Sequence, residues 1–239
     1  PSKLLYLIIP IIGTLMLLVH EAAFFMYLPM IIGFWIYRCP YEIKGKIFIF
    51  FVMAAVTLVI SINGKVEHMS FAKHYEALTV QYGSVVSKSS LYVLHRNLDD
   101  NLEYTVNSIN EKRLVDHIAF FLTFLPLFLL FKKVFLKIKK IRKDNWKVSL
   151  LLFSCISALL LYPLGEDHFR WWAVSISNLF LVFALLAYND ESIRIIINEV
   201  FKTHKKLIIL SIIFSILLGP LGNPSAYPHA LYQFFLMHI

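Results

Sequence analysis

The chain has 239 residues, of which 59% are hydrophobic and only 16% are charged. A soluble domain is about 45–50% apolar, so this composition, with a mean hydropathy of +0.69, excludes an ordinary soluble globular protein. The formal net charge is +8, but the basic residues gather in loops beside apolar runs, as the topology of a membrane protein requires. The charge therefore gives no support for a nucleic-acid partner.

Seven apolar runs follow one another along the chain: Leu4–Val19, Ala22–Tyr37, Ile47–Ile62, Ile118–Phe131, Val148–Leu164, Trp171–Tyr188 and Leu207–Leu221. Helices of roughly 17–25 residues cross a ~30 Å hydrocarbon layer, so several runs lie near the lower limit. They predict an all-α, polytopic helical membrane protein with about 6–7 transmembrane helices. We expect residues 1–239 to form one integral membrane domain that crosses its membrane several times.

The first 37 residues allow two interpretations. A single helix over Leu4–Tyr37 would be about 51 Å long, too long for one crossing. Either two short spans meet at His20–Glu21, or Pro10 and Gly13 break the chain and one helix follows from about Thr14. The first alternative lacks a turn residue near position 20, which counts against it. Both alternatives place His20 and Glu21 in the outer leaflet or at its surface.

Basic residues assign the sides of the membrane. The loop over residues 131–147 carries eight basic residues against one acid, so the positive-inside rule makes it cytoplasmic. Alternation then places 38–46 and 189–206 inside as well. With Lys3, the inner side holds 16 basic and 5 acidic residues, and the outer side 7 basic and 10 acidic. The predicted outer segments are His20–Glu21, residues 63–117, residues 165–170 and residues 219–229.

The outer loop 63–117 is the only sizeable predicted segment outside the membrane. Within it, residues 66–82 place Phe71, Tyr75, Leu78 and Tyr82 on one helical face, and a more polar helical piece follows. The loop is therefore expected to be helical.

Residues 190–206 read as an amphipathic helix, with acids in the first turn, bases in the last and isoleucines between. We expect it to lie at the cytoplasmic interface of the membrane.

His20 and Glu21 stand between two long apolar runs. A charge at the bilayer centre costs about 2.5–3.5 kcal/mol on insertion scales. Glu21 is therefore either a carboxylate in an outward cavity, able to act as a base oriented by His20, or part of an interfacial pair that marks a helix end. The pair begins like the zinc-protease signature H-E-x-x-H, but Phe24 occupies the fifth position and no H-x-x-x-H pair occurs anywhere. No metal site is expected.

The stretch GEDHFRWW, residues 165–172, opens the sixth apolar run. Asp167 favours the start of a helix and shares a face with Arg170, and Trp171 fits an interfacial aromatic belt. A capped helix start explains these residues, and so does a site in which Arg170 anchors a phosphate that Asp167 orients. Ser175 and Asn178, further along the same helix, are weaker candidates for lining that cavity.

The stretch from His20 to Pro29, of the form H-E-[AG]-x-F-x-x-x-x-P, and D-x-x-R-W at Asp167, Arg170 and Trp171 resemble two elements of a known family. They are similar to motifs of the bacterial Wzy-type and EpsG-like polysaccharide (O-antigen) polymerases. Members of that family usually have more spans, so the resemblance implies a C-terminal fragment or a truncated relative.

The resemblance implies polymerisation of glycan repeat units linked to undecaprenyl pyrophosphate, at the outer face of the inner membrane. It implies no cofactor or metal; the expected partners are the lipid-linked glycan, membrane lipids and other polysaccharide-assembly proteins. Glu21 or Asp167, then His20, would be the catalytic base. The residues expected to bind substrate are Arg170, His168, Trp171, Asn178, Arg96 and Arg113.

Other classes of protein use similar residues. A transporter or flippase for a polar or lipid-linked glycan would also place His, Glu, Asp and Arg in an outward cavity, although the halves of this chain show no symmetry. A zinc-dependent membrane hydrolase would need histidines at fixed spacing within the spans, and these are missing from the sequence. A non-catalytic assembly subunit is a further alternative.

Overall fold

The computed structural model describes residues 2–20, 22–39, 42–64, 66, 68–107, 111–141, 145–164 and 168–218. Every regular element within these ranges is helical, so the all-α prediction is correct for this part of the chain. The first elements are α1 (Ser2–Val19), α2 (Ala23–Met26), α3 (Leu28–Arg38), α4 (Ile43–Asn63), α5 (Phe71–Tyr82), the 3₁₀ turn η1 (Gly83–Val85), α6 (Lys88–Val93) and α7 (Leu98–Asn107). They are followed by α8 (Glu111–Ile141), α9 (Asn145–Cys155), the 3₁₀ segment η2 (Ser157–Leu164), α10 (His168–Asn189), α11 (Glu191–Thr203) and α12 (Lys205–Leu218).

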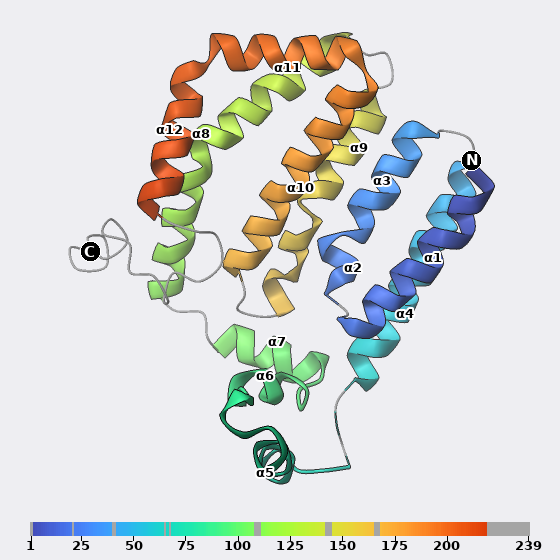
Figure 1. Cartoon of the computed structure of the whole chain (residues 1–239), viewed down its shortest axis with the longest axis vertical. Coiled ribbons are helices and arrows are strands. Elements are labelled where there is room, and N and C mark those ends of the chain that lie inside the picture. Colours follow the sequence, from blue (N-terminus) through green and yellow to red (C-terminus); the bar gives the residue numbers. More distant parts are fainter. Residues whose placement is uncertain are drawn as a thin grey trace.

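The long helices run side by side as a bundle, and different elements lie at its two ends (Figure 1). At one end α11 crosses over the bundle, where α3, α8 and α10 finish and α9 begins. At the other end lie the start of α10, the end of α1 and the separate helices α5, α6 and α7. Where they are described, the segments assigned by charge to the two sides of a membrane therefore lie at opposite ends of the bundle.

Two helices are long and apolar enough to cross a membrane, Ile43–Asn63 in α4 and Arg170–Asn189 in α10. A third span exists if α9 and η2, bent by 47° relative to each other, are one crossing. The stretches Leu4–Leu18 and Ala23–Arg38 are apolar but shorter. Two or three spans thus meet the criteria of length and composition among the described residues, and the expected 6–7 are not confirmed.

The described residues 2–20 and 22–37 form a hairpin. α1 runs towards the end of the bundle where α10 begins, and α2 and α3 return beside it (Figure 1). The turn needs no glycine because helical bonding continues into it: the His20 amide donates to Met16 O at 2.9 Å, and the Ala23 amide donates to His20 O at 3.0 Å. Pro10 lies inside α1 and does not end it. The chain therefore forms two short helical segments that meet near residue 20, and not one long helix from Thr14.

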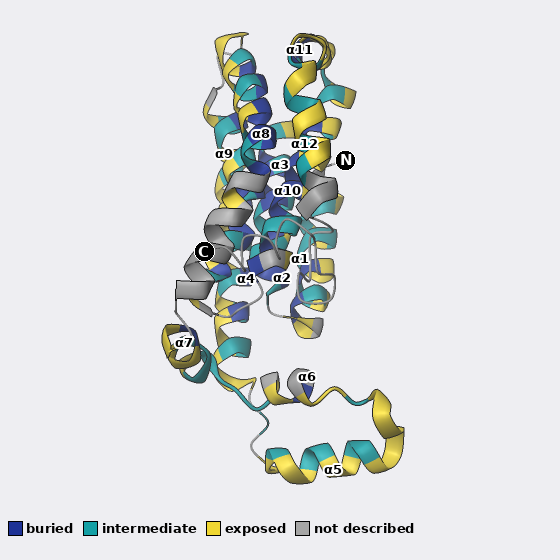
Figure 2. Ribbon diagram, turned by 90° about the vertical axis from the view of Figure 1, so that its left-hand side faces the viewer, coloured by how far each residue is buried: buried dark blue, intermediate teal, exposed yellow. Residues whose placement is uncertain are grey.

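The main hydrophobic core joins α8, α9, α10 and α11 with α3. Its best buried side chains are almost fully shielded from solvent and include Ile138, Leu151, Val182, Leu186, Ile193 and Val200. Side chains of α1 and α4 are apolar yet exposed, as expected where lipid replaces water; they include Leu4, Leu7, Leu15, Phe48, Phe51 and Val59. Figure 2 shows this contrast between buried and exposed surfaces along the bundle.

The amphipathic helix expected at 190–206 is divided at His204 into α11 and the start of α12. Asp190 caps α11, because its Oδ1 accepts the amides of Ser192 at 2.9 Å and Ile193 at 3.3 Å. The isoleucine face packs into the main core against α8 and α10. Protein therefore covers the buried part of this face, and a position of the helix at the membrane interface stays a prediction.

The basic stretch expected as a loop at 131–147 is largely helix, since α8 continues to Ile141. Lysine is a good helix former, and the charged side chains Lys132, Lys139 and Lys140 are exposed while Val134 and Ile138 are buried. The basic residues from Lys132 to Lys140 therefore extend a packed helix beyond its apolar part.

The predicted outer loop contains α5, η1, α6 and α7, and α5 lies across the bundle axis and apart from it (Figure 2). The helix expected at 66–82 begins at Phe71. The Phe71 ring lies 5.4 Å from Tyr92 and 5.7 Å from His95 between centroids. His74 Nδ1 lies 3.0 Å from His95 Nε2. These ring contacts attach α5 to the chain around α6.

Candidate functional site

One stripe of α10 faces the interior of the bundle. Its residues recur every three or four positions and are all buried: His168, Trp171, Ser175, Asn178, Val182 and Leu186. This spacing places them on one helical face. The half of the stripe nearest the start of α10 carries polar and aromatic groups, and the other half is aliphatic. Any polar chemistry inside the bundle therefore lies at the end where α10 begins.

The aromatic part of this stripe forms a packed layer. The His168 ring stacks on Tyr162 with centroids 4.7 Å apart and meets Trp171 edge-on at 5.1 Å. Trp172 Nε1 donates a hydrogen bond to the Tyr162 hydroxyl, and the Trp172 ring lies 5.6 Å from Phe128. His168 and Trp171 thus belong to the protein interior, and neither presents an open face to a substrate. Trp171 in particular is a core residue rather than a member of an exposed belt.

The hairpin turn meets this layer. Trp171 forms a cluster with Ala158 and Leu161 of η2, and Ala22, Phe25 and Met26 pack against it. His20, two residues before Ala22, is exposed. Arg170, in the first turn of α10, is exposed as well. The structure therefore brings the turn that carries His20 and the start of α10 to one packed unit at the same end of the bundle.

Several predicted site residues lie elsewhere or outside the described part. Glu21 and Asp167 fall outside the described residues, and Arg113 lies in α8 at a position whose side chain is not described. Arg96 belongs to the separate helices: its guanidinium lies 4.3 Å from the Tyr92 ring centroid and 3.9 Å from that of Tyr104. Arg96 is thus part of an aromatic stack outside the bundle, and its role in substrate binding stays a prediction.

Asn178 has a different environment from the one expected. Its side chain is buried, and Nδ2 donates to the carbonyl oxygen of Met26 at 2.7 Å. A second buried side chain, Ser157 of η2, donates from Oγ to the carbonyl oxygen of Phe25 at 2.6 Å. Both bonds reach the end of α2, where the helix breaks before α3. Ser157 was not among the residues expected from sequence to matter.

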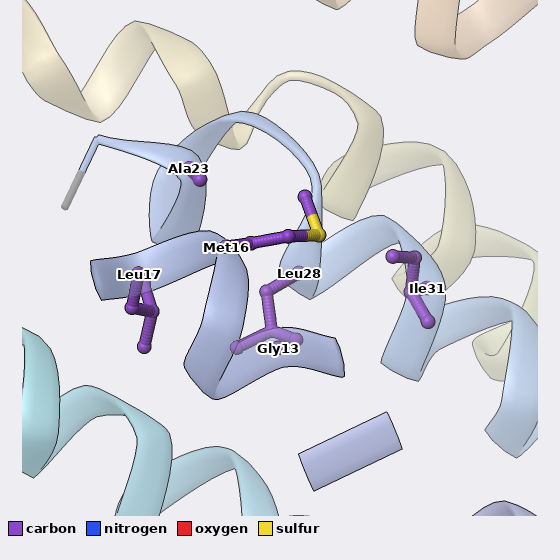
Figure 3. Close-up of a pocket in the computed structure, with 6 residues that line it drawn as sticks. All are labelled: Gly13, Met16, Leu17, Ala23, Leu28 and Ile31. Atoms are coloured by element: carbon purple, nitrogen blue, oxygen red, sulfur yellow. The ribbon is translucent and has the colours of Figure 1, made fainter. Parts of the chain in front are cut away.

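A small cavity lies beneath the hairpin turn, and all of its lining residues lie on α1, α2 and α3 (Figure 3). The lining is apolar and consists of Gly13, Met16, Leu17, Ala23, Leu28 and Ile31. Its free volume of about 10 Å³ is at the limit for one water molecule. This cavity does not hold a sugar or a lipid headgroup.

Among the described residues, no three or more His, Cys, Asp or Glu side chains come together as they would to hold a metal ion. His74 and His95 are adjacent, but their contact is a direct hydrogen bond between the two rings. No protein-family model, curated protein or solved structure matches the chain.

Proposed function

We propose that this protein is a bacterial inner-membrane enzyme of the Wzy-type or EpsG-like class that polymerises lipid-linked oligosaccharide repeat units at the outer face of the membrane. In this proposal the shorter apolar helices also cross, giving about 6–7 spans. One observation supports this proposal. Ala22, two residues after His20, packs against the hydrophobic cluster that contains Trp171, the residue after Arg170. Two motifs about 150 residues apart in sequence thereby belong to one unit, at the end of the bundle away from the basic segments.

The proposed reaction needs a base and a cation. A hydroxyl of the acceptor sugar attacks the anomeric carbon of the donor glycan, and the bond from that carbon to the pyrophosphate oxygen breaks. The hydroxyl proton passes to a carboxylate, Glu21 or Asp167, with His20 as the next candidate. The electron pair leaves with the pyrophosphate, and Arg170 stabilises the charge that develops there. Arg170 is exposed at the start of α10, where a lipid pyrophosphate at the membrane surface can reach it.

The proposal is tested by measuring surface-glycan chain length in cells that carry Glu21→Gln, Asp167→Asn or Arg170→Lys. We expect loss of long chains, with single repeat units remaining on the lipid carrier. Arg194→Lys is the matched control, because Arg194 lies on α11 at the opposite end and pairs with Glu191 at 2.7 Å. Normal long chains in all three site variants would refute the polymerase proposal.

Transport of a lipid-linked glycan is a second candidate function. It is favoured by the two interrupted helices, α2–α3 and α9–η2, because transporters build binding sites from interrupted helices. The same variants distinguish the two functions by the position of the unpolymerised repeat units. These accumulate on the outer leaflet if polymerisation fails and on the inner leaflet if transport fails.

A further inference from the structure

The helix that returns from the hairpin turn is interrupted at a defined place. α2 ends at Met26, Tyr27 has non-helical angles (φ −132°, ψ −37°), and α3 starts at Leu28 with Pro29 in its first turn. In a continuous helix the carbonyl of Phe25 would accept the amide of residue 29, but proline has no amide hydrogen. Pro29 therefore leaves the Phe25 carbonyl without its helical donor.

Two side chains from distant parts of the chain supply donors at this break. Ser157 Oγ lies 2.6 Å from Phe25 O, and Asn178 Nδ2 lies 2.7 Å from Met26 O. Ser157 is 7% exposed and Asn178 is 3% exposed. Inside a membrane no water replaces a missing donor, so each unsatisfied carbonyl is costly. The break is therefore stable only while η2 and α10 stay against it.

The Ser157 hydroxyl has a second acceptor, Ser154 O in the last turn of α9, at 2.8 Å. A hydroxyl has one proton to donate, so the bond to Phe25 competes with this local bond three residues back in the chain. Asn178 has no such competition, because its amide donates across the interface to Met26 alone among the described residues. The two contacts thus hold α2 from two directions, one from η2 and one from α10.

We infer that Ser157 and Asn178 are positioning residues: they hold the break created by Pro29 and so fix the turn bearing His20 relative to the start of α10 bearing Arg170. The connection passes through α2, in which Ala23 and Phe24 separate the held carbonyls from the turn. The consequence for glycan synthesis rests on the proposed function, whereas the positioning itself does not. The inference also gives Pro29, the last residue of the motif that begins at His20, a defined structural role.

The first experiment is a double-mutant cycle between Ser157→Ala and Pro29→Ala, measured as the unfolding equilibrium constant in detergent micelles. Removing the donor to a buried carbonyl should raise this constant by about 5- to 100-fold in the parent chain. In the Pro29→Ala background the new amide at residue 29 supplies the donor, so the effect of Ser157→Ala should largely disappear. An equal effect of Ser157→Ala in both backgrounds would overturn the inference.

Ser154→Ala is the matched control for this cycle. Ser154 is a buried serine one turn earlier, and its hydroxyl donates at 2.7 Å to Leu151 O within the same helix. Its effect should be equal with and without Pro29. If Pro29→Ala does not fold, the pair Ser157→Thr and Ser157→Val gives the same information, since the two side chains have the same shape and only threonine keeps the hydroxyl. The inference requires threonine to be the more stable of the two.

The second experiment measures position rather than stability. Spin labels at Leu18 and Ser177, both exposed, report the distance between the end of α1 and α10 in a chain whose native cysteines are replaced. Asn178→Ala and Ser157→Val should broaden this distance distribution, and Ser157→Thr should not. Unchanged distributions in variants that are merely less stable would refute a positioning role.

Failure of this inference and failure of the proposed function are distinguishable. Broadened distances with normal glycan chains would leave the positioning role intact and refute polymerisation through this site. Unchanged distances, together with loss of long glycan chains in Arg170→Lys, would refute the positioning role and support the proposed polymerase.

Discussion

The contact between α3 and α9 depends on Gly33. A Cβ atom added at Gly33 would lie 2.7 Å from Ser154 Oγ, 3.4 Å from Ser154 Cβ and 3.5 Å from Leu151 Cα. Ser154 Oγ is held by its hydrogen bond to Leu151 O at 2.7 Å, and the nearby backbone of α9 leaves the new methyl group little space. Gly33→Ala is therefore expected to force the two helices apart.

The expected magnitude has two parts. Overpacking a filled interface costs about 1–3 kcal/mol, and replacing glycine by alanine in a helix returns roughly 0.5–1 kcal/mol. Gly33→Ala should therefore destabilise the protein by about 0.5–2 kcal/mol net. Ser154→Ala removes Oγ, which would lie 2.7 Å from the Cβ added at Gly33, and leaves the Cβ of residue 154 at 3.4 Å, an acceptable contact distance. The double variant should thus recover most of the overpacking cost, with a coupling energy of about 1–3 kcal/mol.

The assay is reversible unfolding in detergent micelles for the parent, both single variants and the double variant. Gly13→Ala is the comparison, because the atom nearest its added Cβ is Met53 Cε at 2.6 Å. That atom is the end of a flexible side chain, so Gly13→Ala should cost less than Gly33→Ala. Equal stability of Gly33→Ala and the parent, or an unchanged effect of Ser154→Ala in the two backgrounds, would refute the reasoning.

Three further predictions concern contacts outside this interface. Asp190→Ala removes the cap of α11 and should lower the free energy of unfolding by about 0.5–2 kcal/mol, whereas Asp190→Asn should retain most of it. Lys137→Ala breaks the ion pair with Glu199, in which Lys137 Nζ and Glu199 Oε1 lie 2.6 Å apart. Because both side chains are exposed, the free energy of unfolding should fall by less than about 1 kcal/mol, and by less still in high salt. His74→Ala removes one partner of the ring-to-ring hydrogen bond between His74 and His95, and hydrogen exchange in α5 should then accelerate relative to the parent chain. An exchange rate in α5 equal to that of the parent would contradict the assigned role of the pair.

Much of the helical architecture can be predicted from local sequence. The apolar runs specify helices because each run satisfies its own backbone hydrogen bonds and presents apolar side chains outward. The basic segments identify one end of the bundle, and acids before an isoleucine face locate the start of α11 at Asp190. The amphipathic pattern of α11 does not reveal whether lipid or protein covers the isoleucines, since either satisfies the same periodicity.

The candidate site, like the fold, can be predicted from sequence only in part. His20 and Arg170 could be selected from sequence because charged groups beside apolar runs are costly and therefore informative. The family resemblance implies substrate binding by His168 and Asn178, which stays a prediction, and the structure shows that His168 packs against Tyr162 and that Asn178 donates to Met26 O. A polar residue in an apolar helix signals that a partner is needed, and it does not say which partner.

In any helix through these residues, Pro29 leaves the Phe25 carbonyl without a donor, because proline lacks the amide hydrogen that the fourth residue onward must supply; this follows from local sequence. That Ser157, 132 residues along the chain, supplies the replacement follows from tertiary packing alone. The need arises from covalent geometry within one turn of helix and is therefore local. Its fulfilment depends on which helices pack together, and that is settled by the burial of side chains from the whole chain at once.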